Sequence, residues 1–186
     1  HDPDSGKELW RWGTWNPGKE KFWRLVPSPV YGDGVILACA PKGQPVYAVK
    51  AGGNGALNDT ALNWVSNDKQ ISSDVPTPLF YEGYFYILNG RNKFLSCIEP
   101  VTGKVVWTER LDAKQKLESS PTAADGKIYV MSHLGEVFVL QAGKDYKLLN
   151  KADMGEKDSR ECRSSIVPAN GGLYIRTDQK LFCIGE

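Results

Sequence analysis

The chain has 186 residues, of which 41% are hydrophobic and 24% are charged, which is the composition of a globular protein with a core. The formal net charge of +1 gives no indication of a nucleic-acid partner, and the longest purely apolar run, 35–40, is too short to cross a bilayer. The 19 glycines and 11 prolines are spread along the whole sequence, which argues against a bundle of long helices. The opening residues, His-Asp-Pro-Asp-Ser-Gly, have turn chemistry, and we expect the chain to begin inside a larger protein.

One short pattern occurs four times along the chain: an acidic or amide residue, then a glycine, then β-branched or aromatic residues. The four pairs are Asp33-Gly34, Glu82-Gly83, Asp125-Gly126 and Asn170-Gly171. Asp-Gly and Asn-Gly favour the positive φ angles of a tight hairpin, so each pair predicts a turn between two antiparallel strands. Successive glycines of the pattern are 43 to 49 residues apart.

Further elements surround each turn in a constant order. A small hydroxyl residue stands before each turn, and a proline follows it in three of the four copies: Ser28-Pro29, Thr77-Pro78, Ser120-Pro121 and Ser165. A third strand is expected after each turn, at 46–49, 95–98, 137–140 and 181–184. A fourth strand containing a tryptophan follows twice, at Trp64 and Trp107, and leucine replaces the tryptophan in the next copy.

Four short strands in every 43 to 49 residues are typical of a β-propeller blade. A β-sandwich would not repeat its turn residues in register, and the coils of a β-helix are shorter. The sequence therefore predicts a single all-β domain of four-stranded antiparallel blades, about four in this chain. Their expected bounds are 22–66, 69–110, 114–150 and 160–185.

The last blade ends after its third strand, whereas an unpartnered fourth strand, 7–12, stands at the start of the chain. We expect 7–12 to pair with 181–184, because each would otherwise present unpaired backbone groups on an exposed edge. The pairing could close a compact ring of one chain, or two chains could exchange the strands as a homodimer. If the chain is one half of a longer protein, the other half supplies the partner strand.

A turn motif precedes two of the tryptophans: Thr102-Gly103-Lys104 before Trp107, and Ser5-Gly6-Lys7 before Trp10. Both copies resemble the tryptophan-docking motif of the pyrroloquinoline quinone (PQQ) repeat family, and the resemblance covers almost the whole chain. It implies a propeller in which Trp10, Trp64 and Trp107 pack against neighbouring blades. Rings of this family have seven or eight blades, so the resemblance implies that this chain forms about half a ring.

The same family includes PQQ-dependent quinoprotein dehydrogenases and cofactor-free propellers similar to BamB, a lipoprotein of outer-membrane protein assembly. The enzymes resemble one another in holding PQQ under a disulfide of adjacent cysteines, beside a calcium-linked carboxylate. No two cysteines are adjacent here, and we expect free, buried thiols at Cys39, Cys97, Cys162 and Cys183. We therefore expect no catalytic residues and no PQQ, calcium or other metal, with a fragment of a quinoprotein dehydrogenase as the alternative.

Propellers usually bind ligands at the mouth of the central channel, where the innermost strands converge. Aligning the first strands places Val26, Val75, Glu118 and Arg163 at equivalent positions, and the loops between second and third strands contain Lys42, Arg91, His133 and Arg176. These cations and the histidine predict a rim that suits an acidic peptide or a small anionic ligand. A simple solvated rim is the alternative. For His133 itself, in the turn between the second and third strands of the third blade, we expect an exposed turn histidine.

Two further tryptophans, Trp15 and Trp23, flank a loop that also contains basic residues. They predict either a protein-binding patch or a cover for the edge of the composite blade. The expected function is a non-catalytic scaffold for protein or ligand binding. By resemblance to BamB-like proteins it would be periplasmic or otherwise extracytoplasmic, and a purely structural module is a third alternative.

Overall fold

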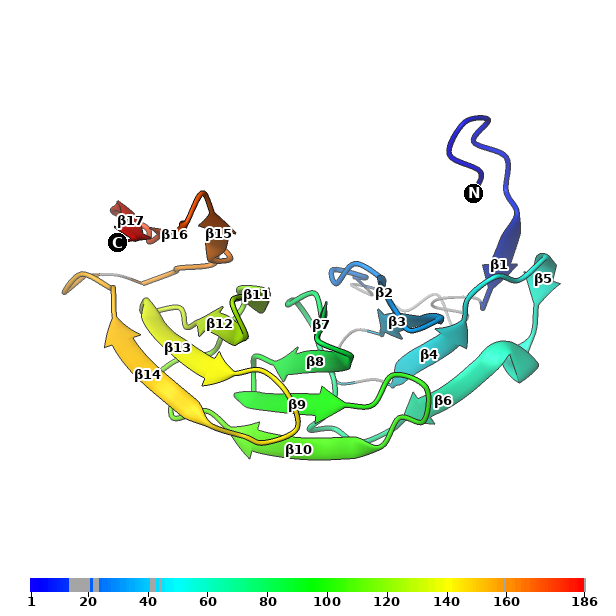
Figure 1. Ribbon diagram of the computed structural model, residues 1–186, viewed down its shortest axis with the longest axis horizontal. Helices are drawn as coiled ribbons and strands as arrows, with labels where there is room; N and C mark the ends of the chain where they lie inside the picture. Colours follow the sequence, from blue (N-terminus) through cyan, green and yellow to red (C-terminus); the bar gives the residue numbers. More distant parts are fainter. Residues whose placement is uncertain (14–20, 22–23, 41–42, 44, 159, 186) are drawn as a thin grey trace.

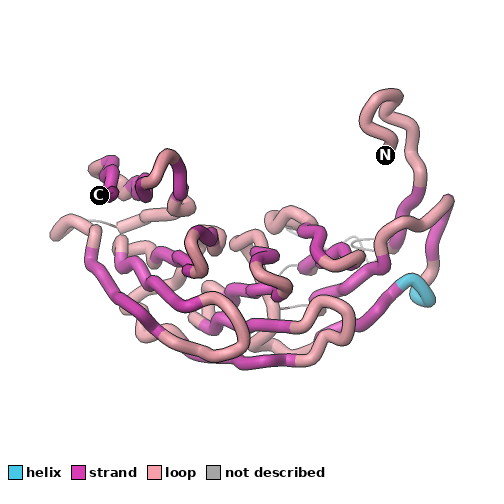
Figure 2. Tube along the Cα trace, viewed as in Figure 1, coloured by secondary structure: helices cyan, strands magenta, loops and turns pink. Residues whose placement is uncertain are grey.

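The computed structural model describes residues 1–13, 21, 24–40, 43, 45–158 and 160–185. These residues form an open arc of β-sheets, with the two ends of the chain at opposite ends of the arc (Figure 1). Figure 2 shows that strands and their connecting loops make up almost the whole trace, interrupted by one 3-10 turn, η1 (Asp59–Ala61). None of the described segments forms a helix long and apolar enough to span a membrane.

The predicted all-β class and the four-stranded antiparallel blades are confirmed, and we number the blades in chain order. Blade 1 consists of β2 (Val30–Gly32), β3 (Val35–Cys39), β4 (Val46–Lys50) and β6 (Leu62–Ser66). Blade 2 consists of β7 (Leu79–Tyr81), β8 (Tyr84–Asn89), β9 (Phe94–Ile98) and β10 (Val105–Arg110). Blade 3 consists of β11 (Thr122–Ala124), β12 (Lys127–Met131), β13 (Glu136–Gln141) and β14 (Leu148–Asp153). Blade 4 has three strands, β15 (Val167–Ala169), β16 (Gly172–Arg176) and β17 (Leu181–Gly185).

The hairpin between the first and second strands of each blade has the predicted turn. The acidic or amide residue has φ between 48° and 50°, and the following glycine has φ between 65° and 79°. Two consecutive positive φ angles match the right-handed twist of the flanking strands, which is why this pair of residues recurs. The prediction of positive φ at Gly34, Gly83, Gly126 and Gly171 is confirmed.

The repeated hydroxyl before each turn links one blade to the next. Thr77 Oγ1 accepts a hydrogen bond from the backbone N–H of Ser28 at 3.0 Å, and Ser120 Oγ accepts one from Thr77 at 2.9 Å. Ser165 Oγ accepts the third, from the N–H of Ser120 at 3.0 Å. These bonds form a chain across the four blades just before the first strands, and they give a partner to backbone N–H groups that lie outside the strands. The conserved geometry explains why serine or threonine occupies this place in every repeat.

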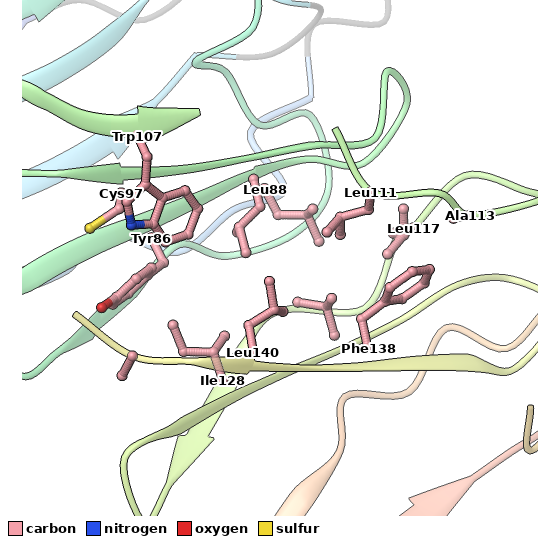
Figure 3. Close-up of a cluster of buried hydrophobic side chains, with 13 residues drawn as sticks. Tyr86, Leu88, Cys97, Trp107, Leu111, Ala113, Leu117, Ile128, Phe138 and Leu140 are labelled. Carbon is pink, nitrogen blue, oxygen red and sulfur yellow. The ribbon is translucent and has the colours of Figure 1, made fainter. Parts of the chain in front are cut away.

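Apolar side chains of adjacent blades form the core. Between blades 2 and 3, Tyr86, Leu88 and Trp107 lie opposite Ile128, Phe138 and Leu140 (Figure 3). The middle strands β8 and β12 are buried on both faces, because each blade is covered by the blade before it and the blade after it.

The strand at the start of the chain does not pair with β17. It forms β1 (Trp10–Trp12), which pairs in parallel with β5 (Gly55–Leu57), a strand in the glycine-rich insertion of blade 1. The ring of Trp12 lies 5.1 Å from that of Tyr47 on β4. Four blades turn through only part of a circle, so β1 and β17 stand at opposite ends of the arc (Figure 1). Of the two alternatives, a compact ring closed within one chain is therefore not formed, and exchange with a second chain remains a prediction.

All four cysteines are free thiols, and Cys39, Cys97 and Cys162 are buried as predicted. Burial raises the pKa of Cys39 and of Cys97 to about 12, which keeps both thiols protonated. Cys183 is exposed, contrary to the prediction, because β17 is the last strand of the arc and no blade covers it.

Candidate functional site

The candidate site lies where each blade meets the segment that leads into the next. The turn between the second and third strands of one blade is hydrogen-bonded to the segment before the first strand of the following blade. Leu117 N–H donates to Gly90 O at 3.0 Å, and Cys162 N–H donates to His133 O at 2.9 Å. A Cβ at Gly90 would lie 1.6 Å from Leu117 O, so this close approach requires glycine.

These contacts bring together a set of charged residues that we call the charged rim. Its members are Arg24, Lys69, Asp74, Arg91, Lys116, Glu118, His133 and Arg163. The sequence alignment placed four equivalent residues in the first strands, but each lies four residues before its strand: Val26 before β2, Val75 before β7, Glu118 before β11 and Arg163 before β15. They belong to the lead-in segments, which is why Glu118 and Arg163 can face the turns of the preceding blades.

Glu118 is the centre of the rim between blades 3 and 4. Its Oε1 lies 2.6 Å from Lys116 Nζ, and its Oε2 lies 2.9 Å from His133 Nε2 and 3.2 Å from Arg163 Nε. Burial by itself raises the pKa of Glu118, but the hydrogen bond from Lys116 and the charge of His133 outweigh it and lower that pKa overall. Glu118 is therefore an ionised carboxylate whose charge is already balanced by neighbouring cations.

His133 is 4% exposed, so the expectation of an exposed turn histidine is wrong. Its backbone N–H donates to Lys116 O at 2.9 Å, and its ring bonds Glu118. The neighbouring hydroxyls are engaged elsewhere: Ser119 Oγ donates to Met131 O, and Ser132 Oγ donates to Glu136 Oε2. Through Glu118, the ring of His133 in blade 3 is connected to Arg163 in the segment that leads into blade 4.

Glu136 is a second buried carboxylate that sequence reasoning missed. Its Oε2 accepts hydrogen bonds from Lys114 N–H at 2.8 Å and from Ser132 Oγ at 3.0 Å, and its Oε1 lies 3.0 Å from Lys151 Nζ. Burial raises the pKa of Glu136, and these bonds outweigh that effect and lower it. No short motif surrounds Glu136 in the sequence, because its partners come from three separate segments.

Two polar cavities lie side by side along the rim between blades 1 and 3. The first, of about 410 Å³, is lined by residues that include Lys69, Asn89 and Asn92, and the second, of about 290 Å³, by residues that include Arg24, Lys116 and Glu118. Both cavities are lined by Asp74 and Arg91, so together they form one groove, which we call the rim groove. In the part of the chain that the structure describes, the side chains of Arg24 and Arg91 have no hydrogen bond or ion pair.

The residues predicted to form the binding rim do not all lie in one site. Arg91 lies in the rim groove, and Arg163 bonds Glu118 and also lies 3.3 Å from Glu161. Arg176 is exposed at the end of β16 and lines neither cavity of the groove. Lys42, Trp15 and Trp23 lie outside the described residues.

Two of the tryptophans proposed for docking bridge adjacent blades. Trp64 Nε1 donates to Pro100 O at 2.7 Å, and Trp107 Nε1 donates to Gly143 O at 3.1 Å. In each case the acceptor lies in the turn between the third and fourth strands of the next blade. Trp10 lies half-buried on β1, opposite Gly55.

The chain resembles several solved structures, all at low sequence identity. BamB from Moraxella catarrhalis has a TM-score of 0.58 at 13% identity, over 78% of this chain and 40% of that one. The computationally designed Ika4 protein has a TM-score of 0.68 at 11% identity, over 97% of this chain and 99% of that one. Quinohemoprotein alcohol dehydrogenase ADHIIG from Pseudomonas putida HK5 has a TM-score of 0.61 at 18% identity, over 83% of this chain and 28% of that one.

These likenesses support the propeller fold, and the chain spans less than half the length of the natural BamB chain. No curated protein matches the sequence. The family model for outer membrane protein assembly factor BamB matches residues 1–181, which is nearly the whole chain. The chain therefore belongs to the BamB family of PQQ-like β-propellers.

Proposed function

We propose that this chain is part of a non-catalytic β-propeller scaffold that binds another protein during outer-membrane protein assembly, outside the cytoplasm. The observation that carries the proposal is the rim groove, where segments of three consecutive blades converge on Arg91. The guanidinium groups of Arg24 and Arg91 have no partner among the described residues and are suited to recognition, whereas His133 and Glu118 beside them are bonded to each other. The family match agrees with a role in assembly.

We expect this chain to hold neither PQQ nor its calcium ion. The four thiols lie in different blades or lead-in segments, so no adjacent pair can form the disulfide of the quinoprotein enzymes. Among the described residues no three His, Cys, Asp or Glu side chains are grouped so that they could hold a metal ion. A quinoprotein dehydrogenase fragment is the second candidate, and the likeness to the alcohol dehydrogenase ADHIIG favours it.

Site-specific photocrosslinking in the envelope of a bacterium with an outer membrane tests the scaffold. A photoreactive residue replaces Asn92 in the rim groove, and in a matched control it replaces Lys104 in the turn between β9 and β10. We expect an adduct with an identified outer-membrane assembly protein at position 92 and none at 104. No adduct at 92, or the same adduct at both positions, contradicts the proposal.

Binding of PQQ separates the two candidates. The purified chain is mixed with PQQ and Ca²⁺, and the bound quinone is measured by its absorbance after gel filtration. We expect no quinone to remain with the protein, because no pair of cysteines and no carboxylate cluster is available to hold it. Binding of one PQQ per chain would favour the dehydrogenase fragment.

A further inference from the structure

The rim groove has more positive charge available to a ligand than its composition suggests. Four cations, Arg24, Lys69, Arg91 and Lys116, line it together with the carboxylates of Asp74 and Glu118. Glu118 is already bonded to Lys116, His133 and Arg163, so it offers little negative charge to a ligand. The guanidinium groups of Arg24 and Arg91, in contrast, have no partner among the described residues.

Arg91 is the central residue of the groove. It lies in the turn between β8 and β9 and lines both the 410 Å³ cavity and the 290 Å³ cavity. The turn that holds it is fixed, because Asn89 accepts a hydrogen bond from Asn92 N–H at 3.1 Å, while its own amide donates to Lys69 O and Ser72 Oγ. A guanidinium group on a fixed turn can bind a carboxylate with two parallel hydrogen bonds.

The shape and the wall of the groove restrict the ligand. Two joined cavities of this size hold several side chains in a row, which is more than one small anion fills. The carboxylate of Asp74, which lines both cavities, would repel the evenly spaced phosphates of a nucleic acid. A peptide can instead space its acidic residues so that they meet Arg91 and Arg24 and avoid that carboxylate.

On the basis of the proposed function, we propose that the rim groove binds an extended acidic peptide segment of the partner protein. One carboxylate of the peptide pairs with Arg91, and a second pairs with Arg24 or Lys69 at either end of the groove. Backbone and polar side chains of the peptide meet Asn92 and Ser72 in the larger cavity. The site thus recognises the spacing of acidic residues along an extended peptide, and it does not require a folded partner surface.

Fluorescence anisotropy with a labelled peptide tests this inference. The probe alternates glutamate with glycine over seven residues, and the control peptide has glutamine in place of each glutamate. Arg91→Ala removes the central guanidinium, Arg91→Lys keeps only its charge, and Arg176→Ala removes an exposed arginine outside the groove. Arg91 packs in no core cluster, so a thermal melt should show all three variants to be folded.

We expect Arg91→Ala to weaken binding of the glutamate peptide at least tenfold, Arg91→Lys to weaken it less, and Arg176→Ala to leave it unchanged. The glutamine peptide should not bind. Equal binding of both peptides, or equal losses for Arg91→Ala and Arg176→Ala, overturns the inference. If inorganic phosphate binds with the same dependence on Arg91 and as tightly as the peptide, the groove is a small-anion site and the inference is wrong. If neither peptide binds while position 92 still crosslinks to an assembly protein, the scaffold proposal stands and the acidic ligand does not.

Discussion

At the scale of single residues, the charged side chain of Glu118 contributes to the contact between blades 3 and 4. Its carboxylate is mostly buried, and a buried charge is costly unless it is paired and hydrogen-bonded. Lys116, His133 and Arg163 provide that compensation from three separate segments of the chain. Removing the carboxylate would leave the cations Lys116 and Arg163 close together without an anion between them, and it would leave His133 Nε2 without its hydrogen-bond partner.

The lowered pKa of Glu118 predicts a loss of stability in acid. The pKa of this carboxyl is lower in the folded state than in the unfolded state, where it is near 4.5. Such a carboxyl stabilises the fold fully at pH values above its unfolded pKa. That contribution disappears as the pH falls from about 4.5 through the lowered folded pKa. Glu118→Gln should therefore reduce the difference in unfolding free energy between pH 7 and pH 3, measured by urea denaturation. Glu109→Gln, at an exposed carboxyl on β10, is the control, and an unchanged difference for Glu118→Gln would contradict the assignment.

The contacts of Glu118 could not be predicted from the sequence. Alignment of the repeats gave equivalent positions for Glu118 and Arg163, but a repeat pattern does not specify which neighbouring turn a side chain faces. That depends on the tight approach at residues such as Gly90, where the lead-in segment contacts the preceding blade. His133 was misjudged for the same reason, since a residue in a turn is buried here by the following segment.

At the scale of the elements, the tryptophans on the outer strands of blades 1 and 2 each connect their blade to the next one. Trp107 on β10 is 9% exposed and donates to Gly143 O, and its ring lies 6.0 Å from that of Tyr86 and 5.3 Å from that of Tyr146. Trp64 repeats the bond one blade earlier, to Pro100 O. In blade 3 the corresponding strand β14 has the exposed residues Leu148 and Leu149, so this bond has no counterpart there.

Replacing Trp107 with alanine should destabilise the fold by about 3–5 kcal/mol, because it removes a large side chain from the core between blades 2 and 3. Trp107→Phe keeps most of the apolar contact and removes the N–H donor to Gly143. Its loss should be smaller, and the difference between the two variants separates packing from the hydrogen bond. Denaturant titration measures both values. A loss below about 1 kcal/mol for the alanine variant would show that Trp107 does not join the blades.

The elements themselves were largely predictable because each has a local chemical signal. The positive φ angles of Asp125 and Gly126, for example, require residues that tolerate them, and this requirement is visible in every repeat. The pairing of β1 with β5 has no such signal. Both strands are three residues long, and the glycine-rich insertion that contains β5 has no counterpart in the other repeats.

At the scale of the whole molecule, the two ends of the arc are unlike its middle. Leu95 and Leu181 occupy the same place in the third strands of blades 2 and 4, yet Leu95 is fully buried and Leu181 is 70% exposed. The chain of hydroxyl bonds also stops: among the described residues Ser28 Oγ accepts no hydrogen bond, and the N–H of Ser165 donates none. Blade 4 therefore presents the face and the edge to which a further strand and blade would bind.

The start of the chain offers a strand of the kind that blade 4 lacks. β1 stands at the end of the arc beside blade 1 (Figure 1), and among the described strands it pairs with β5 alone. We expect two isolated chains to use these edges, with β1 of each chain completing blade 4 of the other. Such an exchange would turn two open arcs into one ring.

The mass of the purified chain in solution, measured by light scattering, tests this account of an incomplete propeller most directly. The account predicts twice the 20.6 kDa of one chain, and it predicts that deletion of residues 1–12 abolishes the dimer or makes the chain insoluble. Leu181→Lys, which places a charge on the exposed end of the arc, should also separate the two chains while the three complete blades remain folded. A mass of 20.6 kDa for the intact chain, or an unchanged double mass after residues 1–12 are removed, would contradict the account.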